Sequence, residues 1–456
     1  MKEVNDYIAD HWMEAIDDLK RLCAQPSISA QNVGMTECAE LVARLLNEYG
    51  IDHRLIPTEG GNPVVYGELE GDSPYTLLFY NHYDVQPPEP LELWTTPPFE
   101  PVIVENKLVA RGVSDDKGDI VARLLAIKAF LQTRRRLPIS IKFLIEGEEE
   151  IGSPRLPAFI RDNKELLKAD ACYWEGGRVS WEDRAEIIAG LKGIVGVELK
   201  ARGAVRDLHS SIGTVVPNPA WRIVWALASL KDADENILIK GFYDDVRAPT
   251  EAEIEAIKEM PSDETELKKS LGIPDFLKGL TGVDLNIYSI LQPACNINGL
   301  ISGYTGEGSK TVLPCEATAK LDFRLVPDQR PDDIIEKLKE HLREQGFGDI
   351  SVTAAEGERP ARTPLESPFV KIVCDAAREV YGSEPILKPS MTGSGPMFFF
   401  TDILGMPVAS SGVCNPDSRP HAPDENIRLA DFLQAARHVA SILERLKFLS
   451  ALDEDS

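Results

Sequence analysis

The sequence lacks several features that would assign it to a particular class of protein. It contains no Cys-x-x-Cys pair, and its seven cysteines are spread along the chain. No segment approaches the ~20 uncharged apolar residues that a membrane-spanning helix needs. Basic residues are outnumbered by acidic ones, 49 to 74, which gives a net charge of −25 at pH 7. Because phosphate binding needs clustered lysine and arginine, nucleic acid and anionic membranes are not expected partners.

The cysteines and the first residues together predict a cytoplasmic protein. The cysteines lie in mostly apolar surroundings, which suits reduced, buried thiols in a reducing compartment. Residues 1–22 are amphipathic and acidic, without the basic start and apolar core of a signal peptide. The acidic excess favours solubility. The alternative is that some of the acidic side chains converge on cations.

The first part of the chain alternates between strand and helix patterns. Residues 76–80, 139–145 and 171–174 are short, apolar and β-prone, as in strands buried on both faces of a sheet. Residues 120–131 and 155–167 have helical spacing. This alternation predicts an α/β domain built on a mixed sheet with helices on both faces.

The pattern changes near Gly190 and changes back near residue 357. In between, residues 195–201 and 317–325 alternate like strands with one solvated face, and two helices are expected. The charged segment 248–284 is predicted to be irregular. Because a chain of 456 residues is too long for one typical core, we expect two domains. The first comprises residues 1–191 and 356–456, and an α+β domain of residues 192–355 is inserted into it.

Polar side chains collect where the apolar strands end. Five motifs carry them, namely Asn81-His82-Tyr83-Asp84, Ser114-Asp115-Asp116-Lys117-Gly118, Glu146-Gly147-Glu148-Glu149-Glu150, Trp174-Glu175-Gly176-Gly177 and His421-Ala422-Pro423-Asp424-Glu425. Each has an ordinary alternative, such as a polar turn, a helix N-cap or a solvated acidic loop. Together they supply imidazole and carboxylate groups to one edge of a sheet, where α/β proteins place their sites. This supply predicts an open, catalytic site for Zn, Mn or Co.

The five motifs, in this order and with these gaps, resemble the aminoacylase, carnosinase and glutamate carboxypeptidase family of di-zinc exopeptidases. The resemblance covers nearly the whole chain. It implies a phosphorylase/hydrolase-like catalytic domain interrupted by a lid and dimerisation domain. The chain length and the Trp-Glu-Gly-Gly motif look more like the dipeptidase branch than the shorter deacylases.

The resemblance also implies a role for each residue of the motifs. The expected metal ligands are His82, Asp115, Glu150, Glu175 and His421, with Asp115 bridging two divalent ions, of which Zn is the first expectation and Mn or Co the alternatives. Asp84 would orient His82, and Glu149 would be the general base. Asp116 is an alternative to Asp115 as the bridge, and the peptide bond between the two is expected to be cis.

Other expected site residues belong to the inserted domain or to a later loop. His209 would enter a neighbouring subunit's site in a homodimer, and Arg324 would bind the substrate carboxylate. Ser394 and Gly393 would form a second anchoring loop, and Thr311 would approach from the partner. The alternatives are a surface histidine and a strand arginine in a nearly neutral salt bridge.

The combined prediction is a metal-dependent dipeptidase or carboxypeptidase that acts on a free C-terminal carboxylate, with a water between two metals and Glu149 as base. Deacylation of N-acyl amino acids is the alternative, because it uses the same groups. A non-catalytic binder is disfavoured because no expected ligand is missing. A P-loop protein is disfavoured because Ser309 separates Gly308 from Lys310, and a serine hydrolase because no Gly-x-Ser-x-Gly elbow is found.

Overall fold

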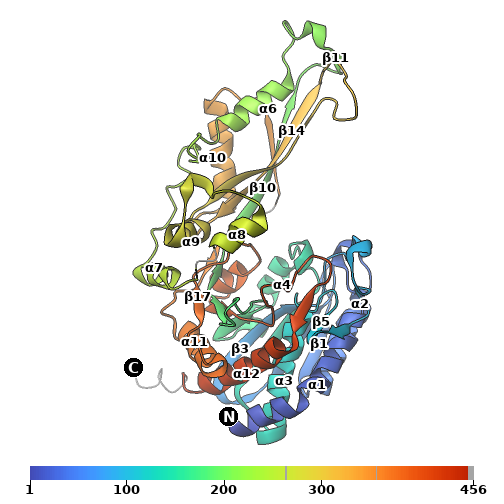
Figure 1. The fold of residues 1–456 in the computed structure, drawn as a ribbon, viewed down its shortest axis with the longest axis vertical. Helices are drawn as coiled ribbons and strands as arrows, with labels where there is room; N and C mark the ends of the chain where they lie inside the picture. The colour runs from blue at the N-terminus through green and yellow to red at the C-terminus, as the bar shows by residue number, and fades with distance from the viewer. Residues whose placement is uncertain (262–263, 356, 450–456) are drawn as a thin grey trace. The chain divides into compact units, whose positions relative to one another are not determined.

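The computed structural model describes residues 1–261, 264–355 and 357–449 (Figure 1). The chain divides into two compact units. The first comprises Met1–Gly190, Arg362–Pro389 and the chain from Pro396 onward, and the second comprises Leu191–Ala361 and Ser390–Gly395. The sequence placed residues 390–395 in the first domain, whereas the structure packs them with the second unit.

The first unit is built on an eight-stranded mixed sheet. Its strands, in spatial order, are β1 (Asp52–Ile56), β2 (Val64–Leu69), β6 (Leu137–Glu146), β3 (Gly71–His82), β7 (Ala171–Trp174), β18 (Val408–Ser410), β8 (Glu186–Ile188) and β17 (Ile386–Lys388). Strand β3 runs parallel to both β6 and β7. The apolar runs of these three strands are buried, as expected for the middle of such a sheet.

Helices lie on both faces of this sheet, as expected (Figure 1). They are α1 (Lys2–Ala24), α2 (Met35–Glu48), α3 (Lys117–Arg134), α4 (Leu156–Asp162), α5 (Lys164–Leu167), α11 (Pro368–Tyr381) and α12 (Leu429–Leu446). The helix expected over 155–167 is divided, because Asn163 leaves the helical region with φ −119° and ψ 26°. A small sheet of β4 (Val102–Val104), β5 (Lys107–Val109) and β19 (Asn426–Arg428) joins two distant parts of the chain.

The carboxyl ends of β3, β6 and β7 meet at one edge of the sheet. His82, the last residue of β3, is in register with Glu146, the last residue of β6. Glu175 follows β7 directly. Parallel pairing therefore brings three of the predicted motifs together, although they are separated by up to about 90 residues along the chain.

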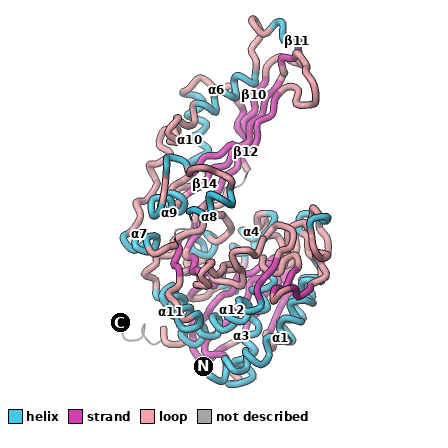
Figure 2. The backbone as a smooth tube through the Cα atoms, in the orientation of Figure 1, coloured by secondary structure: helices cyan, strands magenta, loops and turns pink. Residues whose placement is uncertain are grey.

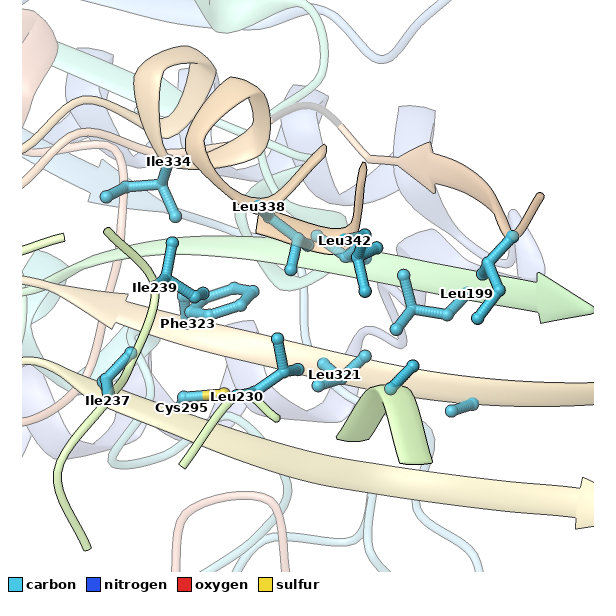
Figure 3. Packing of buried hydrophobic residues seen from close by; sticks show 14 of the residues in the cluster. Leu199, Leu230, Ile237, Ile239, Cys295, Leu321, Phe323, Ile334, Leu338 and Leu342 are labelled. Atoms are coloured by element: carbon cyan, nitrogen blue, oxygen red, sulfur yellow. The ribbon is translucent and has the colours of Figure 1, made fainter. Parts of the chain in front are cut away.

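The second unit contains a four-stranded antiparallel sheet in the order β12 (Ala294–Ser302), β14 (Glu316–Leu325), β10 (Gly193–Arg202) and β15 (Ser351–Ala354) (Figure 2). Alternate residues of β10 and β14 are buried, so one face of the sheet forms the core. Figure 3 shows Leu199, Leu321 and Phe323 on this face below Ile334 and Leu338 of α10 (Pro331–Glu344). The helix α6 (Pro219–Ala228) contributes to the same core.

The prediction of an irregular segment over 248–284 is wrong for much of its described part, and residues 262–263 of it lie outside the described ranges. The structure forms α7 (Glu251–Lys258), α8 (Glu264–Leu271) and α9 (Gly282–Leu291) there. The start of α7 is fixed by a capping box, in which Thr250 Oγ1 accepts from the Glu253 backbone N and the Glu253 carboxylate accepts from the Thr250 backbone N. Ile257 packs with residues of α9 in a small core. These helices were not predicted because their many charged residues leave no clear apolar periodicity.

Within the described ranges, no helix combines the length and apolar character needed to cross a membrane. All seven cysteines lie in these ranges and none is in a disulfide.

Candidate metal centre

Two histidines and several carboxylates of the first unit converge at the sheet edge. Nε2 of His82 lies 3.0 Å from Oδ1 of Asp115 and 3.7 Å from Oε2 of Glu175. Nε2 of His421 lies 3.1 Å from Oδ2 of Asp115 and 3.1 Å from Oε2 of Glu150. The two oxygens of Asp115 thus face different imidazoles. All five expected ligands are brought together, and His82, Asp115 and Glu150 can offer atoms within 4.8 Å of one another.

The orientation of the His82 ring suits a metal ligand. Its Nδ1 lies 3.0 Å from the backbone O of Asp84 and 3.3 Å from Oδ1 of the same residue. Since a carbonyl can only accept, Nδ1 carries a hydrogen and donates it to Asp84, while Nε2 faces the carboxylates and is the ring atom left for a metal. Both residues are fully buried. The expected contact between Asp84 and His82 is therefore present.

Asp84 also holds the turn that follows β6. Its Oδ1 accepts from the backbone N of Glu149 at 3.2 Å, and its Oδ2 accepts from the backbone N of Glu150 at 3.1 Å. Gln86 donates from Nε2 to Oε2 of Glu150 at 2.8 Å. One carboxylate therefore orients His82 and fixes the backbone that carries two further site residues.

The cluster holds more carboxylates than positively charged groups, and both burial and mutual repulsion make these carboxylates favour binding of positive charge. Burial raises the pKa of Glu149 and of Glu175 well above the ordinary glutamate value. The positive charge of His82 lowers these pKa values, whereas the neighbouring carboxylates raise them further. Hydrogen bonds that His421 donates to the carboxylates of Asp115 and Glu150 raise its pKa to about 10. Oε2 of Glu175 is buried without a hydrogen-bond partner. Groups that all favour added positive charge, with no thiolate among them, fit divalent cations.

Asp115 and Asp116 face different neighbours. The peptide bond between them is cis, as expected. Asp115 faces the two imidazoles, whereas Oδ2 of Asp116 accepts from Nδ2 of Asn81 at 2.5 Å and from the backbone N of His82 at 3.3 Å. Asp116, His82 and Glu175 also lie close enough together to bind one metal ion. Neither acid caps α3 through its side chain, so the helix-cap alternative does not apply.

Three buried cationic side chains support the loops around the cluster. Arg123 donates to Oδ1 of Asn81 at 2.6 Å and to the backbone O of Trp174 at 2.5 Å, which ties the ends of β3 and β7 together. Arg111 donates to Oε2 of Glu425 at 2.8 Å. Lys117 donates from Nζ to the carbonyls of Leu22 and Gln25, at the C-terminus of α1. Lys117, the residue after Asp115-Asp116, thereby joins this part of the metal centre to the first helix.

Glycine is required at one position next to Glu175. Gly177 has φ +122°, and a Cβ there would lie 2.5 Å from Cα of Ser411. Any larger residue would push the segment of Glu175 away from the loop that follows β18. This close approach explains the second glycine of the Trp-Glu-Gly-Gly motif.

His209 and Thr311 lie together on the second unit. His209 ends β11 (Leu208–His209), which pairs with β13 (Val312–Leu313). Its side chain is exposed, and Nδ1 accepts from the backbone N of Ser211 while Nε2 lies 3.5 Å from Oγ1 of Thr311. The second ring nitrogen therefore points toward the hydroxyl of the residue just before β13.

Arg324, Ser394 and Gly393 form a second group on this unit. Arg324 alternates with the core residues Phe323 and Leu325 of β14, so it lies on the sheet face that α10 does not cover. Its Nη1 donates to Oγ of Ser394 at 2.9 Å, and Gly393 O accepts from Lys192 N. Nε of Arg324 is 3.7 Å from Asp322, a contact too long to occupy the guanidinium fully. The structure thus brings the predicted anchoring residues together.

Several supporting residues were not predicted. Asn81 and Glu425 lie inside quoted motifs, so their position was a usable signal. Gln86 follows Asp84 by two residues, and its amide would have been expected on the same face of an extended segment. Arg123 lies in a helix as an isolated charge among apolar residues, which is the sequence signature of a buried ion.

An α/β sheet with two imidazoles and several carboxylates at its carboxyl edge is typical of a metal-dependent enzyme. The profile of peptidase family M20/M25/M40 matches residues 78–445. The M20 family metallo-carboxypeptidase Sso-CP2 of Sulfolobus solfataricus is 40% identical and superposes with a TM-score of 0.91 over 95% of this chain and 99% of that one. The chain therefore belongs to peptidase family M20/M25/M40 and is a metallopeptidase, which confirms the predicted family, fold and enzyme class.

Named dipeptidases are also similar over most of their length. The Beta-Ala-His dipeptidase of Rattus norvegicus is 27% identical over 409 residues, which is 87% of this chain and 82% of the relative. The Cys-Gly metallodipeptidase DUG1 of Saccharomyces cerevisiae is 28% identical over 405 residues, covering 84% and 82%. These similarities agree with the predicted dipeptidase-like branch.

Proposed function

We propose that the protein hydrolyses the peptide bond of dipeptides and short peptides that end in a free carboxylate. The observation that carries this proposal is the bridge of Asp115 between His82 and His421, beside the carboxyl of Glu149. The relatives named above are two dipeptidases and a carboxypeptidase, and both activities need a substrate with a free C-terminus. The same comparisons do not favour deacylation.

The ligands divide naturally between two divalent cations. His82, Asp115 and Glu175 would hold one, and His421, Asp115 and Glu150 the other, with Zn as the proposed metal because imidazole and carboxylate ligands suit it. When bound, the cations lower the pKa of water and polarise the scissile carbonyl. Asp84 keeps the His82 hydrogen on Nδ1, which leaves Nε2 free as a ligand.

Glu149 is proposed to move the proton. A carboxylate with a raised pKa can accept a proton from the attacking water and then deliver it to the nitrogen of the leaving amine. The Asp84 carboxylate fixes the backbone N of Glu149, which holds the base in place without occupying its side chain. In this role Glu149 binds neither cation, so its loss should affect turnover rather than metal content.

The two units are proposed to have different tasks. Residues 1–191 and 356–456, apart from the segment 390–395 that packs with the second unit, would form the catalytic domain, and residues 192–355 the lid and dimerisation domain. Arg324, which already donates to Ser394, offers a planar pair of donors suited to a carboxylate. The loop of Gly393 and Ser394 would hold the same terminal group.

We propose a homodimer in which His209 of each chain donates to the oxyanion in the partner's site and Thr311 supports it. The second unit offers a surface for association. Trp221 and Trp225 stack on the exposed side of α6, and the edge strand β12 exposes Leu300 and Ile301. An exposed apolar edge strand is a ready template for pairing with another chain. A cytoplasmic location is proposed from the unpaired cysteines.

The proposal is tested with purified protein loaded in turn with Zn, Mn and Co. The substrates are a panel of dipeptides, the same dipeptides with a C-terminal amide, and N-acetyl amino acids. We expect turnover of the free dipeptides, a large loss with the amides and loss of activity after chelation. Turnover of N-acetyl amino acids alone would replace the proposal by deacylation. Metal-replete protein that hydrolyses none of the panel would refute an enzymatic role on these substrates.

A further inference from the structure

The side chain of Glu425 accepts hydrogen bonds from several residues of the loop that leads to Asp115. Its Oε1 accepts from the backbone N of Ser114 at 2.9 Å, from Oγ of Ser114 at 2.9 Å and from the backbone N of Asp115 at 3.1 Å. Its Oε2 accepts from Nη1 of Arg111 at 2.8 Å and from the backbone N of Gly112 at 2.9 Å. The residue is 1% exposed. Two oxygens thus receive five donors, all from the segment that ends at Asp115.

The backbone around Glu425 is joined to the same segment. Its carbonyl accepts from the backbone N of Ala110 at 3.0 Å. The next residue, Asn426, begins β19 and pairs with Val109 of β5. Glu425 therefore fixes the loop of Asp115 to the loop of His421, which lies four residues earlier in the chain.

The loop of His421 needs such support. Arg419, His421 and Asp424 all have positive φ, at 54°, 62° and 59°. L-residues seldom adopt this conformation, and it persists only where surrounding contacts determine it. Asp424 accepts from the backbone N and Oγ1 of Thr95, which fastens the middle of the loop. Glu425 fastens its end.

From these contacts we propose that Glu425 is a positioning residue for the metal centre. It touches no expected substrate atom. It sets the distance between Asp115 and His421, which face each other at 3.1 Å, and so prepares the pocket of the second cation. This inference rests on the proposed ligand roles. Residues that orient ligands in this way typically change metal affinity by about 10–100-fold when replaced.

The test replaces Glu425 by glutamine, which keeps the volume but has only one acceptor oxygen. The amide NH2 of Glu425→Gln would face backbone N–H donors on one side of the loop. We expect Zn²⁺ titration against a chelating indicator to show one site near wild-type affinity and the other weakened by about 10–100-fold. Activity should return toward the wild-type value when Zn²⁺ is raised to saturate the weakened site. A general loss of structure would not be rescued in this way.

Glu186→Gln is the matched control. Glu186 is another buried glutamate of the first unit, and its Oε2 accepts from Arg178 and Lys388. We expect this variant to unfold at a lower temperature and to bind both Zn²⁺ ions with unchanged affinity. Equal weakening of Zn²⁺ binding in Glu186→Gln and Glu425→Gln would overturn the positioning role.

Ser114→Ala provides a second, milder variant in case Glu425→Gln does not fold. It removes a single donor to Oε1 and should weaken the same Zn²⁺ site by about tenfold at most. Wild-type Zn²⁺ affinity at both sites in every folded variant would overturn the inference. Wild-type protein that binds two Zn²⁺ ions but hydrolyses no peptide would refute the proposed function and leave the Glu425 result valid. Wild-type protein that binds no Zn²⁺ would overturn both.

Discussion

The two units carry their candidate functional residues in opposite ways. In the first, His82 and Asp84 are fully buried, and each loop that bears an expected ligand is fastened by further hydrogen bonds. In the second, His209 and Thr311 are exposed and joined by one 3.5 Å contact. The first arrangement is ready for chemistry before substrate arrives. Under the proposed function, the second would gain its remaining partners from a substrate or another chain.

The largest effect is expected from removing the proposed base. Glu149→Ala should lower kcat by about 10³-fold, because general acid–base catalysis typically contributes 10²–10⁴-fold. The content of metal should stay at the wild-type value, as measured by elemental analysis. Glu148→Ala is the control, since its carboxylate instead accepts from the backbone N of Asn62. A kcat within tenfold of wild type would remove Glu149 from the mechanism.

His209→Ala tests whether the exposed histidine works in a partner's site. The loss of one oxyanion donor should lower kcat by about 10²–10³-fold. Mixing this variant with Glu149→Ala should restore about one quarter of wild-type activity, because half of the dimers become mixed and each mixed dimer has one intact site. Lack of recovery after subunit exchange, verified by mass spectrometry, would argue that each site is complete within one chain.

Arg324→Met tests recognition on the second unit. Loss of a charged hydrogen bond to the substrate carboxylate should lower kcat/KM for free dipeptides by about 10–100-fold. The already poor C-terminal amides should change little. Lys320→Met, on the same face of β14, is the control. An equal loss for free and amidated peptides would show that Arg324 acts on stability or geometry instead.

The smallest expected effect concerns stability in acid and leaves activity unchanged. His438 is buried in the first unit, where Nε2 donates to the carbonyl of Val373 and burial lowers its pKa to about 4. Because the unfolded chain binds the proton first, this group costs stability as pH falls from about 6.5 to about 4, by at most about 3 kcal/mol. Above that window its contribution is constant.

His438→Gln should therefore flatten the loss of thermal stability between pH 6.5 and pH 4. His341 is the counterpart in the second unit, where burial also lowers the pKa of the imidazole. His341→Gln should flatten the profile less. The measurement is the unfolding midpoint against pH for the three proteins. A slope unchanged in His438→Gln would show that other groups control the acid response.

The sequence predicted the parts of the molecule that depend on local pattern. The apolar runs of β3, β6 and β7 located the sheet, and the polar residues directly after them located the metal centre. The helical spacing of residues 120–131 likewise located α3, Lys117–Arg134. These predictions are correct because strand burial and helical amphipathicity can be recognised from consecutive residues.

The remaining features depend on contacts between distant residues. Neither the fastening of Asp115 by Glu425 nor the packing of residues 390–395 with the second unit leaves a periodic signal. The segment 248–284 was misjudged because its charged helices are stabilised by a capping box and a small core, not by a broad apolar face. Assignment of the two cations' ligands came from the family resemblance, since spacing alone could not divide them.

The contact between Lys117 and the first helix has a practical consequence for protein engineering. The ammonium is fully buried and its acceptors, the carbonyls of Leu22 and Gln25, belong to the C-terminus of α1. Trimming the chain past this helix would remove both acceptors of this ammonium, two residues from Asp115, and so loosen the loop of the metal centre. Shortened versions should therefore retain α1, and a purification tag is better attached before Met1 than used to replace the first turns.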